Sequence, residues 1–124
     1  MGWVAVGVGA ALGAWLRWGL GLWLNAAPFP VPLGTLAANL GGGFVIGCAI
    51  ALFQTHASLP AEWRLFLITG FLGGLTTFST FSAEAMMLLQ RGQYLWVFAH
   101  SALHLIGSIA CCIAGYAAWQ AMTS

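Results

Sequence analysis

Charged side chains are almost absent from this sequence. Its 124 residues include no lysine, no aspartate, three arginines and two glutamates, while hydrophobic types make up 61% of the chain. A soluble domain carries about 25% charged residues because its surface must be hydrated. Residues 18–61 and 92–124 contain no Asp, Glu, Lys or Arg at all. Most of the surface of this protein is therefore expected to face lipid.

The shortage of charge also excludes several classes of function. Nucleic-acid binding needs several convergent cations, and a net charge of +1 without an arginine cluster offers none. We expect no secretory signal, because the first positive residue, Arg17, lies inside the first apolar run and not ahead of it. The two carboxylates are expected toward the ends of apolar runs, so enzyme chemistry has no support.

Four stretches are long and apolar enough to cross a bilayer, which takes about 20 helical residues. They are Trp3 to Leu24, Leu33 to Phe53, Glu62 to Leu89 and Tyr94 to Trp119. The third is longer than a straight crossing requires, so tilt, an interfacial turn or an irregular segment would absorb its surplus. The connections are too short for a soluble domain. We predict an all-α integral membrane protein with a single domain over residues 1–124.

Few charges are available to orient the chain in the membrane. An excess of Lys and Arg normally marks cytoplasmic loops. Arg64, beside Glu62, is expected on the side of the termini, and Arg91, with Arg17 as a further candidate, on the opposite side. This near balance favours insertion in both orientations. Two opposed copies would then associate as an antiparallel, dual-topology homodimer.

Small residues predict close packing between the helices. Spacings of four join Gly9 with Gly13, Gly43 with Gly47, and Gly70 with Gly74. Such pairs let helix backbones approach each other within lipid. The three cysteines, Cys48, Cys111 and Cys112, fall inside apolar runs and are expected to be packing residues rather than disulfides or metal ligands.

Polar residues inside the spans are candidates for packing or for function. Thr35 and Asn39 are four apart in the second span and share a face, and the Asn39 amide suits either an interhelical hydrogen bond or a ligand. In the fourth span Ser101, His104 and Ser108 share a face. A serine inside a helix usually donates a hydrogen bond to the backbone of its own helix, and we expect the same of these two serines.

The remaining ionisable residues give weaker signals. His100 and His104 have the spacing of a metal-binding pair, but no third ligand is expected beside them, so we predict no catalytic metal site. Glu84 and Arg91 are seven apart, about two helical turns, and are expected to pair near the interface. Arg17 is expected to extend toward an interface or a wet vestibule.

The third span contains the least helical segment of the chain. Gly73 and Gly74 precede a run of threonine and serine residues, and both residue types weaken a helix. We therefore predict a break near mid-membrane, buried in protein or lining a wet cavity, where free carbonyls are able to coordinate a cation. Phe78 and Phe81, three apart, would share a face. They are either ordinary apolar packing or a path that presents positive ring edges to a small anion.

These motifs resemble one protein family over essentially the whole chain. The segments "GGLTTFSTFSAE" at residues 73–84, "GTLAANLGGGFVIG" at 34–47 and "GAALGAWLRW" at 9–18 are similar to those of the Fluc (CrcB) fluoride channels. The TTFSTFS core is the most specific of them. The fourth span matches only in general character, so its pore residues are the least secure part of the resemblance.

The resemblance implies an antiparallel homodimer with two fluoride pathways and a structural sodium ion at its centre. It implies that Phe78 and Phe81 line the path with their ring edges and that Asn39 donates to fluoride. The neighbouring hydroxyl groups implied are those of Ser79, Thr80 and Ser82, with Thr35 and Ser108 as weaker candidates. Gly73 and Thr76 would give backbone carbonyls to sodium.

On this resemblance the protein exports fluoride passively across the bacterial inner membrane and so limits fluoride toxicity. A proton-coupled multidrug exporter with four spans is the alternative, but it needs a membrane-embedded carboxylate, and none is expected at mid-depth. A purely structural subunit is a third possibility, and it would leave the TTFSTFS segment unexplained.

Overall fold

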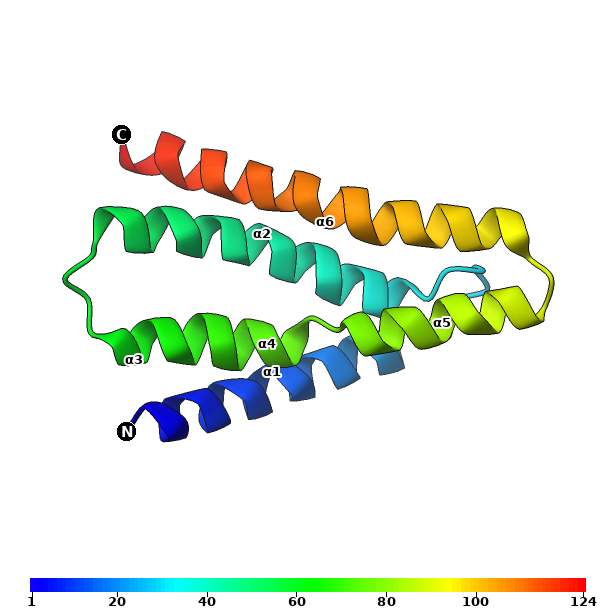
Figure 1. Cartoon of the computed structure of the whole chain (residues 1–124), viewed down its shortest axis with the longest axis horizontal. Coiled ribbons are helices and arrows are strands. Elements are labelled where there is room, and N and C mark those ends of the chain that lie inside the picture. Colours follow the sequence, from blue (N-terminus) through cyan, green and yellow to red (C-terminus); the bar gives the residue numbers. More distant parts are fainter.

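The chain folds into helices joined by short connections, and the computed structural model describes all of residues 1–124 (Figure 1). The elements are α1 Gly2–Leu24, α2 Leu33–Thr55, α3 Ala61–Arg64, the π-helix η1 Leu65–Leu72, α4 Gly73–Leu75, α5 Phe78–Gln90 and α6 Tyr94–Thr123. Elements α3, η1, α4 and α5 follow one another along a single span, Ala61–Gln90. There is no strand, so the all-α prediction is confirmed.

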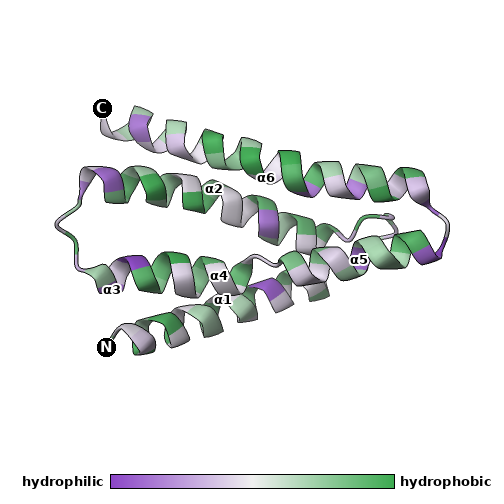
Figure 2. Cartoon of the chain, in the orientation of Figure 1, coloured by the Kyte–Doolittle hydropathy of each residue, from purple (hydrophilic) through white to green (hydrophobic).

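Four helical stretches are long and apolar enough to cross a membrane. They are Gly2–Leu24, Leu33–Thr55, Ala61–Gln90 and Tyr94–Thr123. The prediction of four spans is confirmed, with the third and fourth each 30 residues long. Figure 2 shows hydrophobic residues distributed around these helices and not confined to one side. Such helices suit a lipid surrounding, and the chain is a multi-pass membrane protein.

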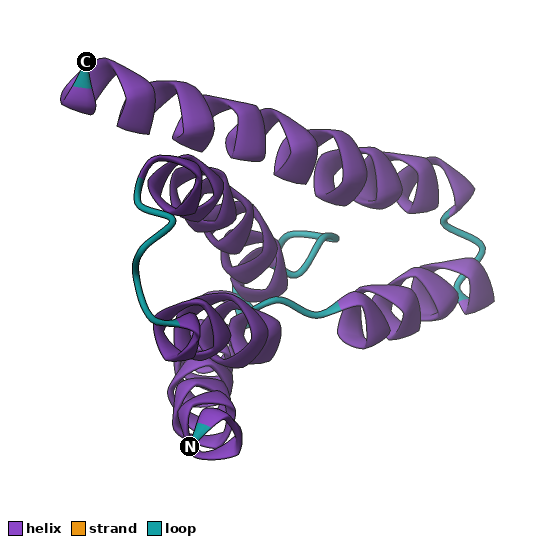
Figure 3. Ribbon diagram, turned by 60° about the vertical axis from the view of Figure 1, so that its left-hand side comes forward, coloured by secondary structure: helices purple, strands orange, loops and turns teal.

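The helices pack mainly as two pairs, α1 with the first half of the third span and α2 with α6 (Figures 1 and 3). A Cβ added to Gly70 would lie 2.8 Å from the carbonyl oxygen of Val6, and one added to Gly43 would lie 2.8 Å from that of Ser108. Glycine is thus required at Gly70, where the third span meets α1, and at Gly43, where α2 meets α6. The small-residue spacings correctly predicted these contacts.

The first half of the third span is wound more loosely than an α-helix. Residues Leu65–Leu72 form a π-helix, and α4 ends at Leu75. Thr76 and Thr77 then adopt extended backbone, with ψ angles of 153° and 118°, before α5 begins at Phe78. Figure 3 shows this short connection between two helical segments that point in different directions.

The connection between α1 and α2 is held by one amide side chain. The Oδ1 atom of Asn25 accepts hydrogen bonds from the backbone N–H groups of Gly34 at 2.6 Å and Thr35 at 3.2 Å. These N–H groups belong to the first turn of α2 and have no partner within the helix. Asn25 therefore fixes the start of α2 and places Thr35 inside the bundle.

Candidate functional site: the interrupted third span and its polar surroundings

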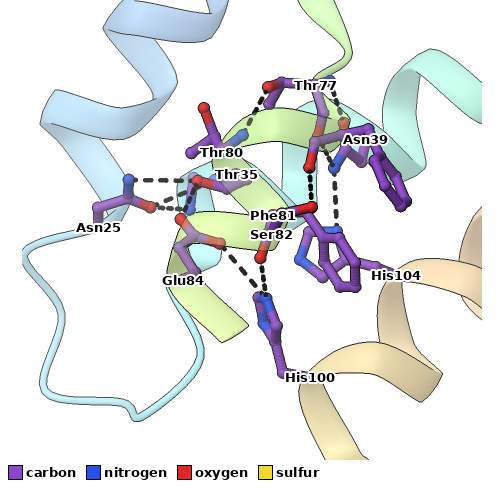
Figure 4. A network of polar contacts seen from close by, with 12 residues as sticks. Asn25, Thr35, Asn39, Thr77, Thr80, Phe81, Ser82, Glu84, His100 and His104 are labelled. Atoms are coloured by element: carbon purple, nitrogen blue, oxygen red, sulfur yellow. Dashed lines mark hydrogen bonds and ion pairs between the residues drawn. The ribbon is translucent and has the colours of Figure 1, made fainter. Parts of the chain in front are cut away.

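Asn39 holds the non-helical residue Thr77 on both sides of its backbone (Figure 4). The Thr77 N–H donates to Oδ1 of Asn39 at 2.7 Å, and Nδ2 of Asn39 donates to the Thr77 carbonyl at 3.1 Å. This reciprocal pair identifies the oxygen and the nitrogen of the amide, because exchanging them would oppose donor to donor and acceptor to acceptor. Asn39 thus joins α2 to the interruption through an interhelical hydrogen bond, which is one of the two roles that the sequence left open for it.

The second N–H of Asn39 is also used. Nδ2 lies 2.9 Å from Nδ1 of His104 on α6. Because the amide nitrogen can only donate, Nδ1 of His104 is the acceptor, and the proton of the neutral imidazole is on Nε2. In this arrangement Asn39 has no free N–H for another ligand.

Two carbonyl groups at the interruption lose their usual helical donors. The Thr77 N–H, which would bond the Gly73 carbonyl in a continuous helix, goes to Asn39 instead. The Thr80 N–H, which would bond the Thr76 carbonyl, goes to the Thr77 hydroxyl at 3.1 Å. The carbonyls of Gly73 and Thr76 are therefore oxygen atoms available to a hard cation.

Arg17 also contacts this segment. Its Nε donates to the carbonyl oxygen of Gly74 at 3.0 Å. The sequence predicted that Arg17 extends toward an interface or a wet vestibule, and it did not indicate this contact with a carbonyl freed by the interruption. The side chain joins α1 to the end of α4.

Phe81 lies among aromatic rings, whereas Phe78 is largely exposed. The Phe81 ring centroid is 4.9 Å from that of His100, 4.8 Å from that of His104 and 5.4 Å from that of Phe78. Phe78 has 80% of its surface exposed in the single chain and packs only against Phe81 among these rings. The two phenylalanines are adjacent, as predicted, but their surroundings differ.

The candidate hydroxyl groups divide into bonded and free ones. Thr35 donates to Glu84 at 2.6 Å, and Ser82 donates to the carbonyl of Phe78 at 2.8 Å. Ser79 lies 3.3 Å from the Thr77 hydroxyl, and either oxygen is able to donate. The hydroxyls of Thr80 and Ser108 have no such partner. A ligand would therefore reach these two without breaking a protein hydrogen bond.

Glu84 lies inside the bundle, and the predicted pair with Arg91 is wrong. Besides accepting from Thr35, its Oε1 lies 3.6 Å from Nε2 of His100, and its side chain is only 11% exposed. Position on the helix explains the error, because the face of α5 that carries Glu84 turns toward α2 and α6. The expectation of no carboxylate beside the histidine pair is wrong for the same reason.

This carboxylate raises the question of a metal site. Glu84, His100 and His104 each offer one potential ligand atom, and these atoms lie within 4.8 Å of one another. However, Asn39 donates to Nδ1 of His104, so Nε2 carries the proton. Binding a metal through that Nε2 would require the loss of the Asn39 contact, and the arrangement favours a hydrogen-bonding role for His104.

The interruption opens onto a cavity of about 500 Å³. Its polar lining comes from Asn39, Thr76, Thr77, His104 and Ser108, and its aromatic lining from Phe78 and Phe81. None of the lining residues is a carboxylate or an arginine. The cavity therefore combines uncharged polar groups and two aromatic rings with aliphatic side chains.

Comparison with known proteins agrees with this geometry. The sequence profile of the family described as "CrcB-like protein, Camphor Resistance (CrcB)" matches residues 4–116. The chain belongs to this family. The match covers the three motif segments, the interruption and most of α6.

Named relatives are similar over nearly the full length. A protein of Cupriavidus metallidurans is 61% identical over 109 residues, which cover 88% of this chain and 86% of the relative. A protein of Pseudomonas putida is 60% identical, and the matched residues cover 92% of this chain and 90% of the relative. A protein of Ralstonia pickettii is 55% identical, and the match covers 99% of this chain and 96% of the relative. All three are named fluoride-specific ion channel FluC.

The structure adds residues that the sequence argument did not place. Thr77 and His104 join Asn39, and Glu84 and His100 form a second polar group beside them. The i, i+4 spacing of the histidines was a signal that both face the same side of α6. Nothing in the sequence indicated that Asn39 and Glu84 would meet that side, because their neighbours come from other helices.

Proposed function

We propose that this chain forms a fluoride channel that exports fluoride passively from the cytoplasm. The observation that carries the proposal is its similarity, at 55–61% identity over 86% or more of each chain, to three proteins named as fluoride-specific channels. The cavity beside the interruption supports it, because its lining includes the free hydroxyl of Ser108 and the rings of Phe78 and Phe81, but no arginine that would trap a small anion.

The proposed path runs along the face that carries the TTFSTFS segment. Its residues would be Asn39, Phe78, Phe81, Ser79, Thr80, Ser82, Thr35 and Ser108. Free hydroxyls at Thr80 and Ser108 are ready to donate, whereas Thr35 and Ser82 would exchange an existing bond for one to the ion. Weak, successive contacts of this kind favour passage over retention.

The working unit in this proposal is an antiparallel homodimer with dual topology. The exposed ring of Phe78 supports a second copy, since 80% of this residue is uncovered in the single chain, next to exposed Ser79 and Ser82. A polar and aromatic strip of this kind is a poor lipid-facing surface. Opposed insertion is supported by the balance of arginines across the two sides.

A structural sodium ion would bind where the third span is interrupted. The carbonyls of Gly73 and Thr76 fit this role, because their usual N–H donors are bonded elsewhere and a hard cation prefers oxygen ligands. Copies of these carbonyls from two subunits would complete the site. Sodium would hold the subunits together and would not drive transport.

Passive export suffices because of the acid–base chemistry of fluoride. Hydrogen fluoride crosses the bilayer, dissociates inside the cell, and leaves a trapped anion that the channel releases. This role places the protein in the bacterial inner membrane as a channel without catalytic activity. Lipid and a second copy of the chain would be its only required partners.

Glu84 supports a second candidate function, a proton-coupled exporter of cationic compounds. Such a transporter needs a carboxylate within the membrane, and the Glu84 side chain is 11% exposed between helices. Its Thr35 and His100 neighbours would then form the proton site. The cavity lining contains no carboxylate, which favours the channel.

Flux from liposomes distinguishes the two functions. Purified protein should release fluoride but not chloride with the same pH on both sides, and should not move a cationic drug when a proton gradient is applied. Replacing Glu84 by Gln gives the matched comparison, because an exporter would lose its proton exchange entirely. Drug movement driven by protons, without fluoride release, would reject the channel.

A further inference from the structure

A second cavity, of about 220 Å³, lies between the end of α2 and the start of the third span. Its six lining residues are all hydrophobic: Leu52, Phe53, Leu59, Trp63, Phe66 and Leu67. None of them lines the cavity beside the interruption. Apolar cavities of about 150 Å³ stay dry and accept hydrocarbon guests. The second cavity is therefore suited to hydrocarbon and not to water or ions.

This second cavity lies at the level of a membrane interface. It is at the end of the bundle that also holds both chain termini (Figure 1). Trp63, in the first turn of the third span, is 59% exposed. Tryptophan at the end of a span favours the level of the lipid headgroups. Leu67 lies one helical turn further along the span, about 6 Å deeper. The cavity thus extends from the headgroup level toward the acyl chains.

An arginine without a counter-charge lies at the edge of the second cavity. The Cζ atom of Arg64 is 5.1 Å from the centroid of the Phe53 ring, and that ring lines the cavity. Arg64 is exposed and forms no salt bridge, since the only close pair of opposite charge joins His100 and Glu84. Glu62 does not face it, because side chains two apart on a helix point to different sides. A guanidinium over a ring keeps N–H groups at its rim for another acceptor.

A phosphate group and an acyl chain together match this site. The planar fork of a guanidinium binds phosphate oxygens through two parallel hydrogen bonds. A glycerophospholipid carries its phosphate at the interface and its acyl chains below it. We propose that Arg64 binds the phosphate of one anionic glycerophospholipid while an acyl chain of that lipid occupies the second cavity. A net negative headgroup is favoured, because the ammonium of a zwitterionic lipid would bring a second cation toward Arg64.

A second copy of the chain is a poorer occupant of the second cavity, because it brings no carboxylate to Arg64. The chain contains two glutamates. Glu84 lies inside the bundle with an 11% exposed side chain. Glu62 of a copy in the proposed antiparallel dimer would be at the opposite face of the membrane. Protein packed over Arg64 would therefore bury an uncompensated charge, which is strongly unfavourable, whereas a lipid phosphate supplies the missing charge.

Native mass spectrometry of the purified protein in detergent measures the headgroup preference. We expect the wild type to bind one phosphatidylglycerol per chain about fivefold more tightly than phosphatidylcholine with the same acyl chains, as for one arginine beside an anionic headgroup. Arg64→Gln should abolish this preference. Arg91→Gln is the matched control and should keep it, because Arg91 is also exposed at an end of the third span but does not adjoin the second cavity.

Filling the second cavity tests the contribution of the acyl chain. Leu59→Trp adds a large apolar side chain from the connection, where Leu59 is 38% exposed and lies outside the core of the bundle. This variant should bind both lipids more weakly than the wild type and keep the preference for phosphatidylglycerol. Arg64→Gln should show the reverse pattern, with phosphatidylcholine binding unchanged. Wild-type binding of both lipids by Leu59→Trp would show that the cavity holds no acyl chain.

Photocrosslinking in liposomes identifies the occupant directly. Benzoylphenylalanine in place of Leu59 should give an adduct with the added mass of phosphatidylglycerol. A covalently joined pair of chains would show that a second copy fills the cavity and would overturn the proposal. Equal binding of the two lipids by the wild type, or equal losses in Arg64→Gln and Arg91→Gln, would also overturn it.

These outcomes are independent of the proposed channel, because none of the measurements uses fluoride flux. Wild-type liposomes that release no fluoride would reject the channel and leave the lipid site intact. Wild-type protein that conducts fluoride but shows no lipid preference would reject only the lipid site. If Arg64→Gln fails to fold, the lipid preference of the wild type and the crosslink at position 59 still decide.

Discussion

Replacing Phe78 by Ile tests the ring-edge mechanism more cleanly than the same change at Phe81. Ile keeps an apolar side chain but lacks the positive ring edge that would face the anion. The structure predicts different structural costs for the two replacements, because Phe81 has three aromatic neighbours within 5.4 Å and Phe78 has only Phe81 among them. A loss of flux at Phe78 is therefore easier to assign to permeation.

The magnitudes follow from these contacts. An aromatic pair contributes about 0.5–1.5 kcal/mol beyond its buried area, so Phe81→Ile would lose about 1.5–4.5 kcal/mol from its pairs and Phe78→Ile about 0.5–1.5 kcal/mol. If the ring edge lowers the barrier to permeation by about 1.4 kcal/mol, its loss reduces flux about tenfold. Met at either position should retain more flux than Ile, because its polarizable chain adapts in shape.

The assay is fluoride efflux from liposomes, normalised to the amount of folded protein, which we propose to be a dimer, as measured by size-exclusion chromatography. We expect Phe78→Ile to elute as the wild type does and to conduct at about a tenth of its rate or less. Phe81→Ile should lose flux as well, together with part of the folded fraction. Intact Phe78→Ile and Phe81→Ile dimers with undiminished flux would refute ring-edge coordination, and the two rings would then be ordinary packing.

Three further predictions concern topology, sodium and packing. A single cysteine introduced into the connection at residues 91–93 should be labelled from both membrane faces, and lysines added there should bias the orientation and lower activity; labelling from one face only would refute dual topology. Fluoride should flow down its own gradient with equal sodium on both sides, because the proposed sodium ion would be held structurally by carbonyls at the interruption; a requirement for a sodium gradient would contradict this. Gly47→Ala should disrupt the packing of α2 against α6, because the new Cβ would lie 2.9 Å from the backbone nitrogen of Tyr116. Gly41→Ala is the control, since a Cβ there meets nothing within 4 Å. The two variants are compared by size-exclusion chromatography, and identical profiles would show that the helices adjust to the added methyl group.

The membrane class, the number of spans and the packing faces could be read from the sequence. Long apolar runs without charge are stable only in lipid, and in lipid a backbone must satisfy its hydrogen bonds within a helix. Glycines four apart lie on one helical face, so Gly43 and Gly47 indicated a close contact before any partner was known. These features depend on composition and on spacing along one helix, which the sequence records directly.

The polar site depended on tertiary structure. Asn39 was recognised as a candidate, but its two partners come from segments 38 and 65 residues away. Glu84 was expected to pair with Arg91 on its own helix, yet it meets Thr35, 49 residues away, and His100. The rotation of each helix and the choice of its neighbour decide such contacts, and both are set by packing of the whole bundle. For the same reason the spacing of His100 and His104 could show that the two rings share a face, while only the fold showed that His104 meets Asn39 and that His100 meets Glu84.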